Sequence, residues 1–488
     1  MSQPDLSTAR AKNLALMLLA MTQFVVVIDA SIVNVALPSI GDALHISQAD
    51  LTWVVNSYTL TFGGFLLLGG RLADYFGRRR IFMVGIALFA IASLLGGLAQ
   101  NETWLITARA VQGLGAAIAS PAALSIITTT FSEGQERNRA LGIWGAVAGA
   151  GGAAGVLLGG MLTQWAGWEW VLFVNVPIGA FIFWQAPKRL LESTATEETD
   201  RTLDLPGAIT VSAGLALGVY AMVDAANVGW GATRTIVCLA IAAALLVAFV
   251  VIELRTRKPL VPFSIFRLRT LRGANIVGVL IGMSLFSMFF LITLYLQQVL
   301  GFDALQAGFA YLPLAIAIIL TAGAASVLVT RVGFKTVLIV GMLFVAVGLA
   351  WFSQISPGGS YAVDVLGPSI LAGIGLGASF VPVTIAAVTG TEPHEAGLAS
   401  GLINTTQQVG GALGLAILAT IANSKTSDAF ATGASKASAL TTGFSDAFAV
   451  GACFAVVGAV LAAVLISSRD SREHSEAARS GAVAAVAV

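Results

Sequence analysis

The sequence contains little charge. Only 10% of its 488 residues are Asp, Glu, Lys or Arg, whereas an ordinary soluble domain carries roughly 25%. Apolar residues make up 57% of the chain, so water is not its main solvent. A net charge of +1 provides no excess of basic residues, which argues against nucleic-acid binding through bulk electrostatics. The composition therefore predicts a membrane protein.

Cysteine and histidine are also scarce. Cys238 and Cys453 both lie in apolar runs, which indicates packing roles rather than a disulfide framework. The three histidines are scattered over separate loops: His45, His394 and His474. A metal cluster is therefore not expected, and a membrane-embedded transferase remains only a remote alternative. The phosphate-binding pattern G-x-x-x-x-G-K-[ST] is missing, so we expect no cofactor, no catalytic residue, and an ion gradient as the energy source.

Long apolar runs, in contrast, are abundant. One helical crossing of a bilayer needs about 20 mainly apolar residues. Runs bounded by charge, Pro and Gly predict fourteen spans, near 14–36, 51–70, 80–99, 103–123, 140–162, 170–186, 205–225, 235–254, 273–297, 305–329, 335–353, 364–389, 399–421 and 446–467.

The basic residues test this count, because cytoplasmic loops should carry most of them. With fourteen spans, 22 of the 26 Lys and Arg residues share the side of the N-terminus. Three lie in opposite loops, Arg234, Lys425 and Lys436, and Arg109 alone lies inside a span. We therefore predict a multi-pass protein of the bacterial cytoplasmic membrane with both termini in the cytoplasm.

Internal repeats divide the chain. LADYFGRRRIF at 72–82 is echoed by LVTRVGFKTVL at 328–338, and the Gly-Leu-Gly run at 113–115 by the one at 375–377. Paired halves with a site between them are typical of transporters. The predicted segments are a six-helix bundle over 1–186, a cytoplasmic linker over 187–204, two additional spans over 205–254, a basic linker over 255–272, a second six-helix bundle over 273–467 and a cytoplasmic tail over 468–488. The outer loop 422–445 and the tail are expected to be mobile.

The loop GRLADYFGRRR, residues 70–80, carries the strongest motif. Gly70 and Gly77 allow a tight turn between two helices. Asp74 can accept hydrogen bonds from helix N-terminal amides or from a neighbouring Arg, and Arg78 belongs to a basic group at the cytoplasmic face. We expect a hinge that locks and releases the bundle; the alternative is a basic loop that only sets orientation.

This loop resembles that of the major facilitator superfamily, in particular its fourteen-span drug:H⁺ antiporter branch. It matches that family at Gly70, Leu72, Asp74, Gly77 and Arg78, with Tyr75 where a base is common. Four further runs are similar to family motifs: IDASIVNVALPSI at 28–40, RAVQGLGAA at 109–117, GAVAGAGGAAGVLLGG at 145–160 and WEWVLFVNVPIG at 168–179. The chain departs from the family at Val156, where Pro is usual, and at Glu169, where Arg is common.

The resemblance covers nearly the whole chain. It implies an all-α major facilitator fold and proton-coupled export of small amphipathic or cationic drugs by alternating access. An exporter of an endogenous metabolite or lipid with the same fold is the alternative. A monomer is expected.

Two charged residues lie inside predicted spans. A charged carboxylate at the depth of Asp29 costs roughly 2.5–3.5 kcal/mol on insertion scales, and a carboxyl group removed from water holds its proton more readily. Arg109 must likewise find a partner, and counting along the helices places it near the depth of Asp29. We predict that these two residues couple proton movement, with Ser31 and Asn34 as companions of Asp29 and with Gln112 in the network of Arg109.

Small and aromatic residues complete the predicted machinery. A glycine stripe along the fifth span should let another helix approach closely: Gly145, Gly149, Gly152, Gly155, Gly159 and Gly160. A substrate cavity needs apolar walls with a few polar groups. The candidates are Trp53, Asn56, Tyr58, Gln112, Phe286, Phe289, Tyr295, Asn404, Gln407 and Gln408.

Overall fold

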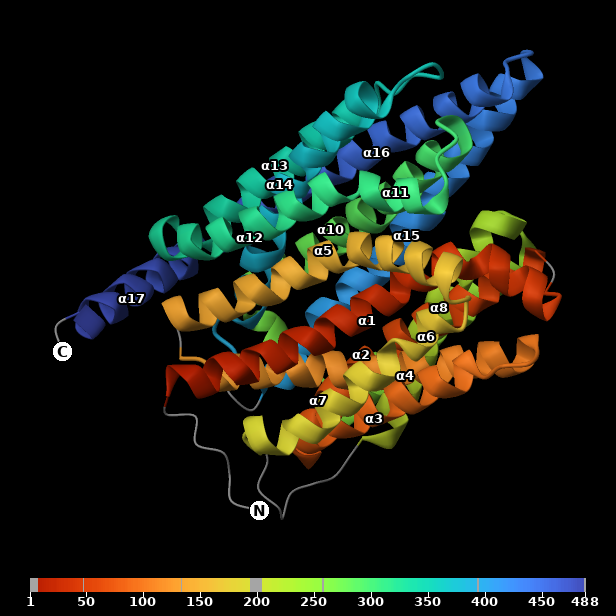
Figure 1. The fold of residues 1–488 in the computed structure, drawn as a ribbon. Coiled ribbons are helices and arrows are strands. Elements are labelled where there is room, and N and C mark those ends of the chain that lie inside the picture. Colours follow the sequence, from red (N-terminus) through yellow and green to blue (C-terminus); the bar gives the residue numbers. More distant parts are fainter. Residues whose placement is uncertain are drawn as a thin grey trace.

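The computed structural model describes residues 8–46, 48–132, 134–193, 204–256, 259–392 and 395–486. Long helices that run side by side dominate this part of the chain, and none of the described residues forms a strand (Figure 1). The all-α fold that the sequence predicts is confirmed.

The helices fall into two halves and an additional pair. The first half comprises α1 (Ala9–Leu44), α2 (Gln48–Phe76), α3 (Arg78–Gly97), α4 (Glu102–Thr130), α5 (Gln135–Trp165), α6 (Trp170–Phe173) and α7 (Asn175–Arg189). The additional pair is α8 (Leu205–Val228) and α9 (Thr233–Arg255), followed by the short helix η2 (Phe263–Arg267). The second half comprises α10 (Arg269–Leu294), η3 (Tyr295–Val299), α11 (Ala304–Ala310), α12 (Leu312–Val332), α13 (Phe334–Phe352), η4 (Tyr361–Val365), α14 (Leu366–Val388), α15 (Ala396–Ala431) and α16 (Lys436–Leu465), and α17 (Ser468–Val486) ends the chain.

Fourteen helical segments correspond to the fourteen predicted spans. Within the described residues, ten are long and apolar enough to cross a membrane by length and composition: α1, α3, α4, α6 with α7, α9, α10 with η3, α11 with α12, α13, η4 with α14, and α16. The other four are α2, α5, α8 and α15. Glycine and polar residues lower the hydropathy of α2, α5 and α15. These helices pack at the centre of the bundle, where such residues contact other helices.

Two segments expected to be mobile are helical instead. The prediction of an outer loop over 422–445 is wrong, because α15 continues to Ala431 and α16 begins at Lys436. No Gly or Pro interrupts α15 between Gly414 and Gly433, so nothing ends the helix earlier. The predicted tail forms α17, whose buried Ser471 and Ala478 pack on the bundle. Of the predicted linker 187–204, residues 194–203 lie outside the described residues.

The two echoed loops adopt the same turn. Gly77 separates α2 from α3 with φ of 104°, and Gly333 separates α12 from α13 with φ of 83°. Both values lie in the region that favours glycine. The repeat between 72–82 and 328–338 is therefore a structural repeat as well.

The predicted repeat between the Gly-Leu-Gly runs 113–115 and 375–377 is out of register by two residues. A Cβ atom on Gly113 would lie 2.4 Å from the Tyr58 carbonyl oxygen of α2, and one on Gly373 would lie 2.7 Å from the Leu314 carbonyl oxygen of α12. The counterpart of the run 113–115 is therefore 373–375 and not 375–377, because close helix contact and not the Gly-Leu-Gly letters fixes the correspondence.

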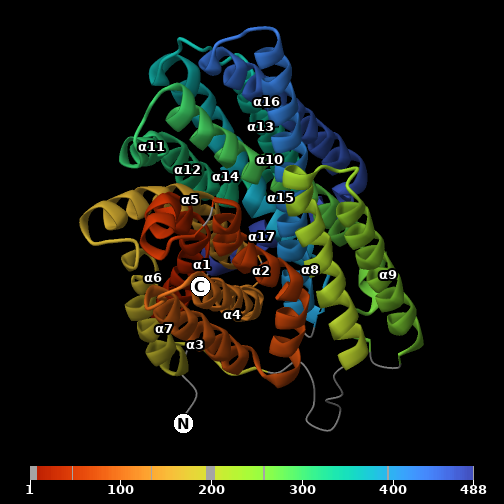
Figure 2. The same ribbon diagram turned by 90° about the vertical axis from the view of Figure 1, so that its right-hand side faces the viewer.

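The halves meet along α5 with α12 and along α2 with α15. The additional pair lies on one side of the bundle, where α8 packs against α2 and α15 (Figure 2). The start of α1 and α17 lie at the same end of the molecule (Figure 1).

Candidate functional site: a buried charged network and an interhalf contact

The predicted contact between Asp29 and Arg109 is direct. Asp29 lies in the middle of α1, and Arg109 lies in α4 one turn before Gly113, where α4 packs closely against the α2 backbone. The Arg109 Nη1 atom donates to Asp29 Oδ2 over 2.6 Å. Both side chains are at most 1% exposed. Each charge is therefore compensated only by protein groups, which is the condition under which burying an ion pair is tolerated.

Neutral side chains complete the binding of the carboxylate. Gln112 and Asn175 each donate an amide N–H to Asp29 Oδ1 over 2.7 Å. The same two amides contact Ser93 Oγ at 3.0 Å, and Ser93 in turn donates to the Leu172 carbonyl. Asp29 thus accepts from three donors on α4 and α7, which fits a charged carboxylate.

Arg109 is held from several sides. Its Nε atom donates to the Val54 carbonyl over 3.1 Å, and Nη1 also donates to Gln112 Oε1 over 2.7 Å. The guanidinium lies 4.4 Å above the Tyr58 ring centre, a geometry that attracts a cation. The buried Nη2 atom has no hydrogen-bond partner among the described residues.

The companions predicted for Asp29 are wrong. Ser31 donates to the Ile28 carbonyl and Asn34 to the Ala30 carbonyl, both within α1. Residues two and five positions away from Asp29 point away from it around a helix. The partners that sequence reasoning missed are Ser93 and Asn175. The only available signal for Asn175 was a polar residue within the motif WEWVLFVNVPIG.

Asp74 joins the halves at the end that carries the basic loop. Its Oδ1 atom accepts from the Gly397 N–H over 3.2 Å and its Oδ2 atom from the Leu398 N–H over 3.1 Å. These are amides of the first turn of α15, where a helix favours negative charge. Arg78 Nη2 donates to the same carboxylate over 3.2 Å. The two kinds of partner predicted for Asp74 are both present, and the carboxylate is 1% exposed.

Glycines allow this contact between α2 and α15. A Cβ atom on Gly70 would lie 2.4 Å from the Gly397 carbonyl oxygen, so any larger residue would push the helices apart. Beyond the turn, Arg78 and Arg79 bind the segment after α7 through Ser193 and the Leu190 carbonyl.

The glycines of α5 face two ways. Gly155 and Gly159 lie against the α1 backbone within the first half. Gly145 and Gly152 lie against Val381 of α14 and Phe289 of α10 in the second half. Gly149 and Gly160 lie in the same helix. The predicted close approach of another helix is therefore present on two sides of α5.

The predicted cavity residues do not form one surface in this conformation. Tyr58, Gln112 and Tyr295 are at most 1% exposed and engage protein groups. Others contact neighbouring rings or their own helix: Trp53 stacks on Tyr220, Phe289 stacks on Tyr311, and Asn404 donates to the Ser400 carbonyl. Three further candidates are partly buried: Asn56, Gln407 and Gln408. The last candidate, Phe286, is 36% exposed.

Paired halves of apolar helices, with a buried ion pair in one and a charge-dependent contact between them, define a helical membrane transporter. A sequence profile of the Major Facilitator Superfamily matches residues 19–415. The chain belongs to the Major Facilitator Superfamily.

Similar proteins cover nearly the whole chain. A cephamycin export protein of Amycolatopsis lactamdurans is 42% identical over 454 residues, 92% of each chain. A puromycin resistance protein of Streptomyces alboniger is 39% identical over 96% of each chain. A lincomycin resistance protein of Streptomyces lincolnensis is 33% identical over 86% of each. In fold, the human organic anion transporter MFSD10 matches 91% of this chain and 99% of its own, with a TM-score of 0.63 at 14% identity.

Proposed function

We propose that this protein exports small amphipathic or cationic compounds of the antibiotic type in exchange for protons, by alternating access. Three similar proteins named for cephamycin export and for puromycin and lincomycin resistance support the substrate class. The sidedness of the basic residues supports a site in the bacterial cytoplasmic membrane with both termini in the cytoplasm. The protein acts as a monomer, catalyses no reaction and needs no cofactor.

The observation that carries proton coupling is the carboxylate of Asp29. It is fully buried, and its charge depends on Arg109, Gln112 and Asn175. A carboxylate in a desolvated site stays charged only while such donors remain in place. If a change of state withdraws them, the neutral acid becomes the favoured form and the group takes up a proton.

The geometry suggests how this exchange could drive movement. The three donors come from α4 and α7, whereas Asp29 is on α1, so a small displacement of α1 alters all of them. Protonation frees the Arg109 guanidinium, which already has one unpaired N–H. Return of Arg109 to Asp29 expels the proton on the other side, so the cycle carries protons inwards as substrate moves outwards.

Transport into inverted membrane vesicles tests this function. A panel of dyes and antibiotics is offered to vesicles with an imposed pH gradient, acid inside. We expect uptake of part of the panel, abolished by a protonophore and independent of ATP. Uptake that does not depend on the pH gradient, or that needs ATP, contradicts the proposal.

A further inference from the structure

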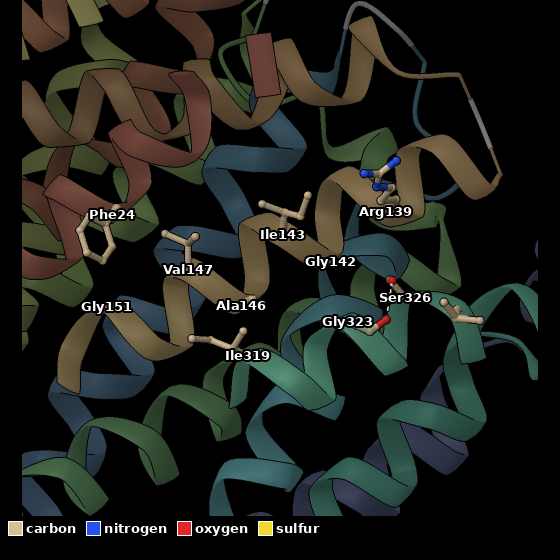
Figure 3. Close-up of a pocket in the computed structure, with 11 residues that line it drawn as sticks. Phe24, Arg139, Gly142, Ile143, Ala146, Val147, Gly151, Ile319, Gly323 and Ser326 are labelled. Carbon is tan, nitrogen blue, oxygen red and sulfur yellow. Dashed lines mark hydrogen bonds between the residues drawn. The ribbon is translucent and has the colours of Figure 1, made fainter. Parts of the chain in front are cut away.

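A groove of about 580 Å³ lies between α5 and α12, away from the buried network. Its volume lies in the range of small-molecule sites, roughly 300–1,000 Å³. Figure 3 shows Arg139 at one end, Phe24 of α1 at the other, and Ile143, Val147 and Ile319 between them. Apart from Arg139 and Ser326, the lining residues are apolar or glycine.

The groove opens to the outside of the bundle. Ile143, Ile319 and Val327 line it and are 37%, 50% and 49% exposed. Ile316 and Leu320, on the same helix, are more exposed still. In a membrane transporter such side chains face lipid, so hydrocarbon can enter the groove from the side.

The groove has the depth of one leaflet. Arg139 is in the second turn of α5 and Gly151 lines the far end. The twelve residue steps from Arg139 to Gly151 rise about 18 Å at 1.5 Å per residue. Half of a bilayer's hydrocarbon core is roughly 15 Å thick. Arg139 therefore lies near the headgroup level, and the apolar walls cover the depth of an acyl chain.

Arg139 is the one charged residue among the described residues that line the groove, and none of them is a carboxylate. Within the described residues Arg139 has neither an ion pair nor a side-chain hydrogen bond. The carboxylate three positions earlier, Glu136, is bound by Lys12 over 2.8 Å and by Ser132. Arg331 lies in the last turn of α12, the other helix that lines the groove. A guanidinium binds phosphate oxygens with paired N–H groups, and basic pockets between cytoplasmic helix ends suit anionic headgroups.

We propose that this groove binds an anionic phospholipid of the cytoplasmic leaflet, with its phosphate on Arg139 and an acyl chain between α5 and α12. The two walls belong to different halves of the molecule. An approach of the halves at this point closes the groove, so the bound lipid favours the conformation described here. This inference does not depend on which compound is exported.

A glycine in the groove permits a sharp test. A Cβ atom on Gly323 would meet nothing within 4 Å, so Gly323→Leu begins in open space, extends into the groove and improves helix propensity. Arg139→Gln removes the charge at the end of the groove away from Phe24 (Figure 3). Leu320→Trp is the matched control, because Leu320 is 69% exposed one turn away and does not line the groove.

The experiment titrates phosphatidylglycerol or phosphatidylcholine into the delipidated full-length protein and counts bound lipid by native mass spectrometry. We expect one tight phosphatidylglycerol site, weakened about tenfold in Arg139→Gln, as for loss of a charged hydrogen bond. Gly323→Leu should weaken it at least as much, Arg139→Lys should be intermediate, and Leu320→Trp should match the unmodified protein. Size-exclusion profiles confirm that each variant is folded.

Three results overturn the proposal. One is equal binding of phosphatidylcholine, and another is unchanged binding in both Arg139→Gln and Gly323→Leu. The third is that a transported dye, and no phosphatidylglycerol, binds in a manner that depends on both positions, because the groove would then be a path for substrate.

Discussion

The two halves share a packing geometry but not its charges. In the first half, a Cβ atom on Gly115 would lie 2.5 Å from the Phe89 amide nitrogen of α3. In the second half, one on Gly375 would lie 2.4 Å from the Val345 amide nitrogen of α13. Each pair of helices crosses at backbone contact, so the repeat has kept the sites where only glycine fits.

At equivalent positions around these helix crossings, the second half does not carry the polar side chains that bind Asp29 in the first half. The register places Ser369 at the position of Arg109, Ala372 at that of Gln112 and Leu349 at that of Ser93. The second half therefore lacks the groups that bind Asp29. Similar packing with dissimilar polar groups indicates that the glycine contacts serve the fold in both halves, and we propose that proton coupling belongs to the first half alone.

The second half has a buried carboxylate of its own at a different place. Asp364 lies in η4, where its Oδ2 atom accepts from Tyr295 over 3.1 Å and from Ser356 over 3.2 Å. Within the described residues these partners are hydroxyl groups and not a cation. Asp364 is thus a natural control for Asp29: it is also buried but is bound differently.

The largest expected effect breaks the charged network. Arg109→Met leaves Asp29 buried without its cation, and loss of one partner of a buried pair costs about 3–5 kcal/mol. Ser369→Ala, at the equivalent position of the second half, should cost less than about 1 kcal/mol. Unfolding of the purified variants measures both. Equal losses would mean that the halves do not differ as we describe.

The shared packing should respond equally in both halves. Gly115→Ala and Gly375→Ala each force a methyl group against backbone atoms, so each should destabilise the protein by about 1–3 kcal/mol. Gly323→Ala, which meets open space, is the control and should be neutral. The same unfolding assay applies. A large loss in one half only would contradict a common packing geometry.

The contact between the halves depends on a charge that only the first loop carries. Asp74→Asn replaces charged with neutral hydrogen bonds to Gly397 and Leu398, a loss of about 1 kcal/mol. We expect substrate binding to be preserved and transport to slow severalfold. Thr330, at the equivalent position of the second repeat, is partly buried and donates to the Val327 carbonyl of its own helix, so Thr330→Ala should transport normally. Turnover of Asp74→Asn at the unmodified rate would exclude a gating role.

The smallest expected effect concerns the surface pair Lys12 and Glu136, which has no described counterpart in the second half. Partial burial opposes the shift, but hydrogen bonds from Lys12 and Ser132 lower the pKa of Glu136. A lowered folded-state pKa stabilises the protein above the unfolded value, about 4.3, and the gain is lost as the pH falls through the folded value.

Glu136 is 36% exposed, so solvent screening keeps this gain under about 1 kcal/mol. Lys12→Ala should therefore lower stability slightly at pH 7 and have no effect near pH 3. Unfolding curves at the two pH values test this, and a difference that persists in acid would contradict the assignment.

Composition and charge distribution were sufficient to predict a membrane protein with fourteen helical spans, whereas the major facilitator fold was predicted from the resemblance of its motifs. Apolar length defines spans, and the sidedness of Lys and Arg fixes their number, because one missed span would reverse every later loop. Helical segments that lack a long apolar run were not predicted. These are α17, the end of α15 and the start of α16, whose polar sequences indicate a helix only through their packing and the absence of helix breakers.

The candidate site could be predicted only in part. Asp29 and Arg109 stand out because charge is rare inside spans. Ser93 and Asn175 do not, because neutral polar residues are common in spans and a single sequence does not specify which helix faces meet. The predicted register of the glycine repeat was wrong for the same reason. The match to 375–377 rested on similar residues, whereas the helix contacts that define the repeat are not visible in the sequence.

We propose that Asp29 carries the coupled proton. The most direct measurement compares Asp29→Asn with Asp364→Asn in inverted vesicles, under an imposed pH gradient and with matched protein amounts. We predict that Asp29→Asn loses gradient-driven uptake, while it retains substrate exchange without a gradient, and that Asp364→Asn keeps both. Full gradient-driven uptake by Asp29→Asn, or its loss in Asp364→Asn alone, would contradict the claim and place the proton site elsewhere.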